Sequence, residues 1–283
     1  MIILNTHRYD ISSDFYFYEK NQLNFKVLLY DIFNYLIIVM KKILVVSAHP
    51  DDEIIGMGGT LTKLSKKHNI SILFLSDGIT SRRATDHVSS PVYEVTEEVY
   101  KKMKKQIDLR KTHAKNALKI VGVKKTRFLD LPNNEVDKFP LLKIIKEIEY
   151  EIQDSQCEVI YTHHYADLNI DHRIAYEAVI TAARPLSGTS VKSIISFEAI
   201  SSTDWRKPYK FNPNMFVDIT SELKVKIRAM KAYKNEIRKF PHPRSIETLE
   251  AVAKRWGSLY GYKAAEAFEI ILTRKENFQD SIL

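Results

Sequence analysis

The feature that most constrains the fold is a short apolar run followed at once by polar residues of metal-binding types. Ile43 to Val46 is rich in β-branched residues and is stopped by His49 and Pro50, so it is too short for a helix. Three carboxylates and three glycines come next, in the sequence Asp-Asp-Glu-Ile-Ile-Gly-Met-Gly-Gly of residues 51–59. The run predicts a buried strand, and the glycines predict a tight turn into the following helix.

The loop after this strand carries donor atoms that suit a catalytic metal. His49 and Asp52 offer a nitrogen and an oxygen of the kinds that Zn²⁺ binds. A catalytic zinc has three protein ligands and an open position, so we expect a third ligand from elsewhere. A carboxylate beside such a site can act as general base, and Asp51 is freer for this than a metal-bound Asp52. The alternative is a solvated first helical turn, where acidic residues favour the helix dipole.

Apolar runs alternate with amphipathic segments from residue 40 onward. We expect strands at 42–47, 70–76, 126–130, 157–162, 193–198 and 215–218, and helices at 57–68, 95–121, 139–155, 172–184 and 221–239. This alternation predicts a single α/β domain over 40–283: a Rossmann-like, doubly wound, mostly parallel sheet flanked by helices, with an elaborated C-terminal portion. In the strand order 3-2-1-4-5, the first and fourth strands are neighbours at the switch point, where ligands bind.

A second polar cluster follows the fourth predicted strand. Residues 163–173 read His-His-Tyr-Ala-Asp-Leu-Asn-Ile-Asp-His-Arg, with three histidines and two aspartates. Because the first and fourth strands are adjacent in the predicted sheet, this loop faces the loop that holds His49. The third metal ligand is therefore expected here, and His172 stands at the start of the next predicted helix.

The segment Ala48 to Glu53, with the glycines after it, resembles the PIG-L (LmbE-like) family of metal-dependent N-acetylglucosaminyl deacetylases. The resemblance extends over about residues 40–275 and is closest to a bacterial branch found with surface-polysaccharide genes. It implies three zinc ligands and a general base, which in this chain are His49, Asp52 and His172, and Asp51.

The chain departs from the commoner family pattern just before His172. Many relatives carry a histidine that stabilises the oxyanion where this chain has Asn169. Asn169 could donate an amide N–H instead, or His163 or His164 could supply an imidazole. These alternatives stay open at this point. Asp171 is expected to orient a neighbouring histidine rather than to bind the metal.

Other polar and aromatic residues near predicted strand ends are candidates for substrate binding. They are Asp77, Arg82, Asp130, Trp205, His242 and Arg244. Trp205 suits stacking on a sugar ring or a partly buried anchor, and the prolines around His242 stiffen a substrate-binding loop. Arg110, on the long predicted helix, either faces the site or forms an ordinary surface ion pair.

Composition limits the class of partner. The net charge is +8, but the lysines cluster on predicted helices, as in 101–105, and no nucleic-acid motif accompanies them, so we expect no nucleic-acid partner. A basic surface favours anionic substrates, or a peripheral membrane contact if the substrate is lipid-linked. The single cysteine, Cys157, is expected to be a buried structural thiol, and its being alone indicates a reducing, cytoplasmic compartment.

Residues 1–39 do not continue the alternation. The apolar segment 27–39 contains Asp31 and Asn34 and is shorter than the roughly 20 residues of a spanning helix. It also lacks a signal-peptidase site. Our hypothesis is that Met40 is the true start and that 1–39 is an irregular extension; the alternative is an interfacial helix near 24–38.

Together these observations predict a zinc-dependent N-deacetylase, a hydrolase of linear amides, with Fe²⁺ as the alternative metal. The expected substrate is a GlcNAc-type amino sugar in a nucleotide- or lipid-linked precursor, and a homo-oligomer is compatible with the sequence. The nearest alternative is the same site acting on a non-sugar amide or another acyl group. A nucleotide-binding module is disfavoured, because Gly56, Gly58 and Gly59 lack the Gly-x-Gly-x-x-Gly spacing and nearby acids repel phosphate. A non-catalytic metal-binding protein is disfavoured by Asp51.

Overall fold

The structure is a computed structural model that describes residues 40–82 and 97–274, apart from the side chains of Arg82, Val99 and Tyr100. The segment 1–39, with its predicted start site and its alternative helix, lies outside the described residues. From Lys41 onward the chain forms one compact unit.

Seven strands within the described residues form one sheet. They are β1 (Lys42–Ser47), β2 (Asn69–Ser76), β3 (Lys125–Leu131), β4 (Val159–His163), β5 (Ser193–Phe197), β6 (Met215–Asp218) and β7 (Ala265–Thr273). Their order in the sheet is β3-β2-β1-β4-β5-β7-β6. The first five strands are parallel, whereas β7 runs antiparallel to both β5 and β6. The predicted α/β class and the predicted order 3-2-1-4-5 are confirmed.

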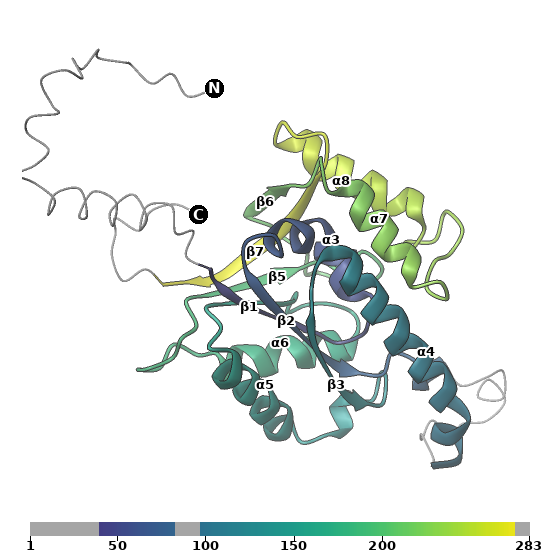
Figure 1. Cartoon of the computed structure of the whole chain (residues 1–283), viewed down its shortest axis with the longest axis vertical. Helices are drawn as coiled ribbons and strands as arrows, with labels where there is room; N and C mark the ends of the chain where they lie inside the picture. Colours follow the sequence, from purple (N-terminus) through teal and green to yellow (C-terminus); the bar gives the residue numbers. More distant parts are fainter. Residues whose placement is uncertain (1–39, 83–96, 275–283) are drawn as a thin grey trace, which may run out of the picture. The chain divides into compact units, whose positions relative to one another are not determined.

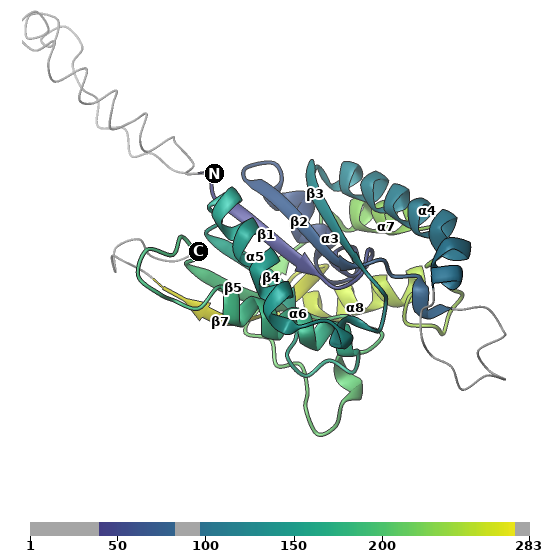
Figure 2. The ribbon, with the colours of Figure 1, turned by 90° about the horizontal axis from the view of Figure 1, so that it is seen from below.

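Helices cover both faces of this sheet (Figures 1 and 2). They are α3 (Asp52–Leu64), α4 (Glu97–Val121), α5 (Leu141–Ser155), α6 (Ile170–Ala182), α7 (Leu223–Ala232) and α8 (Ile246–Leu259). Ile43 and Val45 of β1 belong to the core shared with α3, α4 and α7, whereas Leu44 and Val46 belong to the core shared with α5 and α6. A strand buried on both faces needs apolar residues throughout, which explains the unbroken apolar run.

The helix α3 begins at Asp52 rather than at residue 57 as predicted, and it kinks at Met57 (φ −145°, ψ 22°). The glycines therefore lie inside the helix and do not form a turn before it. A Cβ atom at Gly56 would come within 2.4 Å of the Phe197 ring, and one at Gly59 within 2.7 Å of Ile219. Their function is close packing of α3 against neighbouring elements.

The C-terminal portion differs most from the predicted elements. The helix α7 ends at Ala232 rather than at residue 239, and α8 and β7 follow where we predicted no element. Residues 233–245 form a loop between α7 and α8 instead of a helical end. This loop carries His242 and Arg244, so the earlier helix end decides where these side chains lie.

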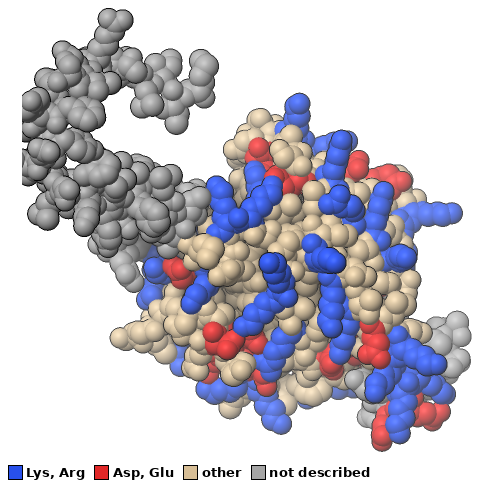
Figure 3. All heavy atoms as spheres, in the orientation of Figure 1, with Lys and Arg blue, Asp and Glu red and all other residues tan. Residues whose placement is uncertain are grey.

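Lysine and arginine side chains are spread over the face shown in Figure 3, with acidic residues between them. On α4, Lys101 and Lys102 lie 2.9 Å from Glu97 and Glu98, one helical turn earlier. The lysine-rich segment is thus a solvated helix face. None of the described helices is both long enough and apolar enough to cross a bilayer.

Candidate active site

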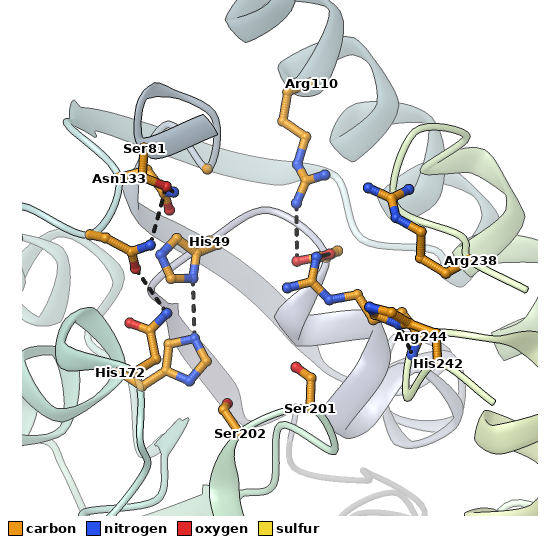
Figure 4. A pocket seen from close by; sticks show the side chains of 14 residues that line it. His49, Ser81, Arg110, Asn133, His172, Ser201, Ser202, Arg238, His242 and Arg244 are labelled. Atoms are coloured by element: carbon orange, nitrogen blue, oxygen red, sulfur yellow. Dashed lines mark hydrogen bonds and ion pairs between the residues drawn. The ribbon is translucent and has the colours of Figure 1, made fainter. Parts of the chain in front are cut away.

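A pocket of about 420 Å³ opens where β1 and β4 end. His49, Asp51 and His172 line it together with Arg110 and Arg244 (Figure 4). The imidazoles of His49 and His172 lie on one side of the pocket, and the guanidinium groups lie on the other side together with His242. The two loops that the sequence predicted to face each other therefore do so, because β1 and β4 are adjacent.

Three donor atoms on these loops form a nearly equilateral triangle. His49 Nδ1 lies 3.1 Å from Asp52 Oδ2 and 3.1 Å from His172 Nε2, and His172 Nε2 lies 3.1 Å from Asp52 Oδ2. Ligand atoms of a tetrahedral Zn²⁺ site with bonds of about 2.0 Å are about 3.3 Å apart. The three buried side chains thus have the donor types and the spacing to hold one divalent cation.

The outer nitrogen of each histidine faces a second carboxylate. Asp171 Oδ2 lies 3.0 Å from His49 Nε2, and Asp167 Oδ1 lies 3.2 Å from His172 Nδ1. A carboxylate at this position holds the proton on the outer nitrogen and leaves the inner lone pair free for a metal. Burial opposes a charge on His172, but Asp52 and Asp167 outweigh it and raise its pKa to about 10. The negative charge of Asp52 and Asp167 therefore favours a cation at this position.

Asp171 is itself fixed by the neighbouring loop. Its Oδ2 accepts a hydrogen bond from the backbone N–H of Asn134 (2.7 Å), and its Oδ1 accepts one from that of Val136 (3.2 Å). Asp167 accepts hydrogen bonds from the hydroxyls of Thr203 (2.7 Å) and Ser202 (3.1 Å). Both carboxylates behind the histidines are thus tied to separate parts of the fold.

Asp51 lies beside the triangle and faces the arginines. It is 1% exposed and has φ 128°, a backbone region that residues with a side chain rarely adopt. Its Oδ1 lies 3.1 Å from Arg110 Nη2, and its Oδ2 lies 3.5 Å from Arg244 Nη1. Burial raises the pKa of Asp51, and the two arginines offset part of that rise. A carboxylate in this setting can exchange a proton with a bound group.

The arginines are held in turn by a buried acid. Glu236 forms ion pairs with Arg110 and with Arg244, the latter at 2.8 Å. The Arg110 guanidinium lies 5.3 Å from the centre of the Tyr233 ring, and the Tyr233 hydroxyl donates a 2.5 Å hydrogen bond to Glu53. Burial raises the pKa of Glu53 to about 8 against that hydrogen bond. Arg110 is thus a buried member of the site and not a surface ion pair.

Three further predicted residues reach the pocket. His242 and Arg244 line it, and the His242 ring accepts a 3.0 Å hydrogen bond from the Arg244 backbone N–H. Asn169 also lines it and is the N-cap of α6, where its Oδ1 accepts a 2.8 Å hydrogen bond from the N–H of Asp171. Its amide nitrogen donates to Asn134 Oδ1 (3.0 Å).

The two upstream histidines do not line this pocket. His163 is fully buried, and its Nε2 accepts a 2.8 Å hydrogen bond from the backbone N–H of Ala48. Burial lowers the pKa of His163 well below its usual value, so the ring is a neutral packing group stacked on His172 at 3.9 Å. His164 is also buried and lies 3.0 Å from Glu269. Their positions do not support the predicted catalytic contribution from either ring.

Three predicted substrate-binding residues also have other surroundings. Asp77 accepts hydrogen bonds from the backbone N–H groups of Ile79 (2.7 Å) and Thr80 (2.9 Å), so it shapes its own turn. Asp130 forms an ion pair with Lys111 away from the pocket lining. Trp205 is 67% exposed and does not line the pocket. The side chain of Arg82 lies outside the described part of the chain.

Several residues of the site were missed by the sequence analysis. Besides Asp167 and Glu236, they are the polar lining residues Ser81, Asn133, Asn134, Ser201, Ser202 and Arg238. Near the end of β3, the sequence analysis selected Asp130 in place of Asn133 and Asn134, which follow it. Asp167 lies in the histidine-rich segment of residues 163–173. Its short distance in sequence from His172 was the signal that could have identified it.

Comparison with known proteins gives this geometry a family. The model of the PIG-L family, GlcNAc-PI de-N-acetylase, matches residues 44–183, which include the whole donor triangle. Residues 44–183 of this chain are therefore a PIG-L family domain. Diacetylchitobiose deacetylase from Thermococcus kodakarensis is 27% identical over 247 residues, covering 82% of this chain and 84% of that protein.

Solved structures of other proteins share the fold. N,N'-diacetylchitobiose deacetylase from Pyrococcus horikoshii superimposes with a TM-score of 0.63 at 22% identity, over 86% of this chain and 90% of that chain. The 4-carboxy-2-hydroxymuconate hydratase GalB from Pseudomonas putida superimposes with a TM-score of 0.62 at 22% identity, over 84% and 100%. Likeness of fold alone therefore does not fix the reaction. The family match and the curated relative support a hydrolytic deacetylase.

Proposed function

We propose that this PIG-L protein removes the N-acetyl group from an N-acetylated amino sugar, giving acetate and the free amine. The observation that carries the proposal is the donor triangle of His49, Asp52 and His172. The carboxylate of Asp51 lies beside it in the same pocket but is not part of the triangle. A metal site with a separate base is the arrangement that amide hydrolysis needs. The relatives that act on diacetylchitobiose support the sugar as substrate.

The three donor residues would hold the metal, which we propose to be Zn²⁺ with Fe²⁺ as the alternative. A divalent cation bound there supplies a Lewis acid for the amide carbonyl and lowers the pKa of a water molecule. Asp171 and Asp167 keep the two imidazoles oriented through their outer nitrogens, so that the inner nitrogens face the site.

Asp51 would act as the general base. It takes a proton from the attacking water and returns it to the nitrogen as the carbon–nitrogen bond breaks, so that acetate and an amine leave. Arg110 and Arg244 hold the carboxylate in place from the opposite side. Asn169 is our candidate donor to the developing oxyanion, because its amide carries two N–H groups and Asn134 accepts from only one of them.

The hydroxyl and amide groups of Ser81, Asn133, Ser201 and Ser202 suit a sugar ring, since they offer both donors and acceptors around the pocket. We further propose a nucleotide- or lipid-linked precursor as substrate, with Arg238, Arg244 and His242 on the side where an anionic group would lie. A buried single thiol at Cys157 fits the proposed cytoplasmic location.

The decisive experiment is acetate release by the wild type and by Asp51→Asn, with metal content measured on the same samples. UDP-GlcNAc, free GlcNAc and a lipid-linked GlcNAc are the substrates, and N-acetyl amino acids represent the alternative amides. We expect Asp51→Asn to lower kcat by roughly 10²–10⁴-fold, the usual contribution of a general base, with metal content unchanged. Asp108→Asn, an exposed carboxylate on α4, is the matched control.

Two results would contradict the proposal. Full activity of Asp51→Asn would remove the general base from the mechanism. Release of acetate only from N-acetyl amino acids by a fully metallated wild type would keep the site but move the substrate to non-sugar amides.

A further inference from the structure

We propose that an exposed aromatic and basic surface beside the pocket docks this protein on an anionic lipid membrane. We call this surface the aromatic rim and define it as Tyr165, Leu168, Trp205, Arg206, Lys207 and Tyr209. The inference deepens the proposed function, on which it rests for its role, by naming the surface from which a lipid-linked substrate would reach the site.

The apolar members of the aromatic rim are exposed to solvent. The exposed fraction is 67% for Trp205, 53% for Leu168, 43% for Tyr209 and 42% for Tyr165. Isolated exposed apolar residues are ordinary on protein surfaces, so contiguity decides whether they form a patch.

The residues of the aromatic rim are contiguous although they come from two loops. The backbone N–H groups of Leu168 and Trp205 both donate to the carbonyl oxygen of Ser202, at 3.3 and 3.2 Å. The ring centroids of Tyr165 and Tyr209 are 5.8 Å apart, and the Arg206 guanidinium lies 5.4 Å from the Tyr209 ring centre. The β4–α6 and β5–β6 loops therefore present one joint surface.

Inward hydrogen bonds hold these two loops in shape. Asp167 accepts from the hydroxyls of Ser202 and Thr203, and the Thr203 hydroxyl also accepts from the Ala199 N–H at 2.7 Å. Asp204 Oδ1 accepts from the Phe211 N–H at 3.1 Å, which closes the base of the segment that carries Trp205. The apolar side chains point outward from an anchored loop, and the segment between β5 and β6 projects from the body of the domain in Figure 2.

The composition of the aromatic rim matches a bilayer interface. Trp and Tyr place an apolar ring in the acyl region and a polar edge at the headgroups, and a neighbouring leucine adds purely apolar area. Arg206, Lys207 and the adjacent Lys210 are exposed cations that can meet lipid phosphates. The Lys207 ammonium donates to the backbone oxygen of Asp204 (3.0 Å) rather than to a carboxylate.

A glycan chain is the other macromolecule that aromatic side chains bind, but it fits this surface less well. Stacking on neutral sugars would use Trp205 and the tyrosines, yet it would leave Leu168 and three cations without a counterpart. An anionic bilayer uses all of them.

The aromatic rim borders the active-site pocket directly. Ser202 accepts the two backbone hydrogen bonds of the rim and also lines the pocket. Asn169, the neighbour of Leu168, lines the pocket too. Docking at the rim would therefore bring the pocket mouth to the headgroup layer, where an amino sugar on a lipid anchor lies.

The test is co-sedimentation of the full chain with phosphatidylcholine vesicles that do or do not contain phosphatidylglycerol. We expect binding to the anionic vesicles and at least a ten-fold weaker binding by the double variant Leu168→Ser/Trp205→Ser. The matched control is Leu186→Ser, which alters a 55% exposed leucine just after the C-terminal end of α6. The aromatic rim lies at the other end of this 13-residue helix, which is about 20 Å long. Residues 1–39 are present in every variant, so their contribution is common to all.

Tryptophan fluorescence gives an independent readout. The chain has two tryptophans, and Trp256 donates a hydrogen bond to Glu198 within the fold. We expect a blue shift of emission with anionic vesicles that disappears in Trp205→Phe. Equal vesicle binding by the double variant, or no shift assigned to Trp205, would overturn the proposal. Binding of a chitin oligosaccharide that needs Trp205, without vesicle binding, would overturn it in favour of a glycan site.

Docking and catalysis are read separately in these experiments. Vesicle binding requires no turnover, and acetate release from a soluble amino sugar requires no vesicle. Acetate release by a wild type that binds neither kind of vesicle would reject the membrane proposal alone. Docking without acetate release from any amino sugar would reject the proposed reaction alone.

Discussion

This protein has two buried ionic clusters that contain similar side chains but have different roles. One joins Lys226 to Glu266 beneath α3, and the other joins Asp51, Arg110 and Arg244 around Glu236 in the pocket. Lys226 and Glu266 are each about 3% exposed, and Asp51 and Arg110 are 1% and 2% exposed. Burial of these four residues is therefore similar, whereas the Arg244 side chain is 27% exposed at the pocket. The clusters also differ in the groups to which they bond.

The Lys226–Glu266 pair closes a break in α3. Because the helix kinks at Met57, backbone groups on either side of the kink lose helical partners. Glu266 accepts hydrogen bonds from the N–H groups of Gly59 (2.9 Å) and Thr60 (2.7 Å), and Lys226 donates to the oxygen of Ile55 (2.8 Å). Both carboxylate oxygens are used, so this cluster is structural.

The pocket cluster keeps hydrogen-bonding capacity in reserve. Asp51 Oδ2 and Arg244 Nε are buried and have no hydrogen-bond partner among the described residues. Buried polar groups are normally satisfied, and exceptions gather at functional sites. A closed cluster, whose polar groups are paired within the protein, stabilises the fold. An open cluster, which keeps unpaired polar groups, is available to a ligand.

Breaking the closed cluster should have the largest effect on stability. Glu266→Ala leaves Lys226 charged and buried without its partner, which costs about 3–5 kcal/mol of unfolding free energy in comparable cases. Urea unfolding followed by circular dichroism measures this. Asp51→Asn, in the open cluster, should lose turnover with a smaller change in stability than Glu266→Ala.

A double variant sharpens the reason. Lys226→Met/Glu266→Leu removes both charges, so it should regain part of the lost stability but not all of it. The N–H groups of Gly59 and Thr60 and the oxygen of Ile55 stay unpaired, at about 1–3 kcal/mol for each buried group. Full recovery would mean that the pair does not cap the kink.

An intermediate effect is expected for a residue that both supports the pocket and stabilises the fold. Asp167 supports His172 in the pocket and also accepts structural hydrogen bonds from Ser202 and Thr203. Asp167→Asn should weaken metal binding by about 10–100-fold, the usual effect of removing the carboxylate behind a ligand histidine. Competition with a chelator measures the affinity, and Asp137→Asn on the nearby short helix Val136–Lys138 is the control. An unchanged affinity would show that His172 needs no carboxylate support.

The smallest effect is expected outside both clusters. Asp130 pairs with Lys111. The side chains of Lys111 and Asp130 are 26% and 32% exposed, so both are less buried than the acids of the pocket. Asp130→Asn should change the unfolding free energy by less than about 1 kcal/mol and leave kcat/KM within two-fold. A large loss of kcat/KM would restore Asp130 as a substrate-binding residue and would break the distinction drawn here.

The sequence by itself determined the parallel part of the sheet, its order β3-β2-β1-β4-β5 and the two loops that carry the donor triangle. Each depends on local patterns: an apolar run buried on both faces, and two short loops that follow strands β1 and β4. Within the second loop, His172 was identified by the resemblance to the PIG-L family. Parallel strands bring their carboxyl ends to one edge, so His49 and His172 could be placed together although 123 residues separate them. No long-range contact beyond strand order was needed.

Only the tertiary structure decided the arginine side of the pocket and the surroundings of the other candidates. Where Glu236, Arg238 and Arg244 lie depends on α7 ending at Ala232, and nothing in the local pattern fixes that helix end. His163, His164 and Asp77 belong to the same polar runs as residues that line the pocket, but their side chains bond inward to the fold. Sequence spacing tells which loop a residue joins, whereas the packing of distant elements decides which way its side chain points.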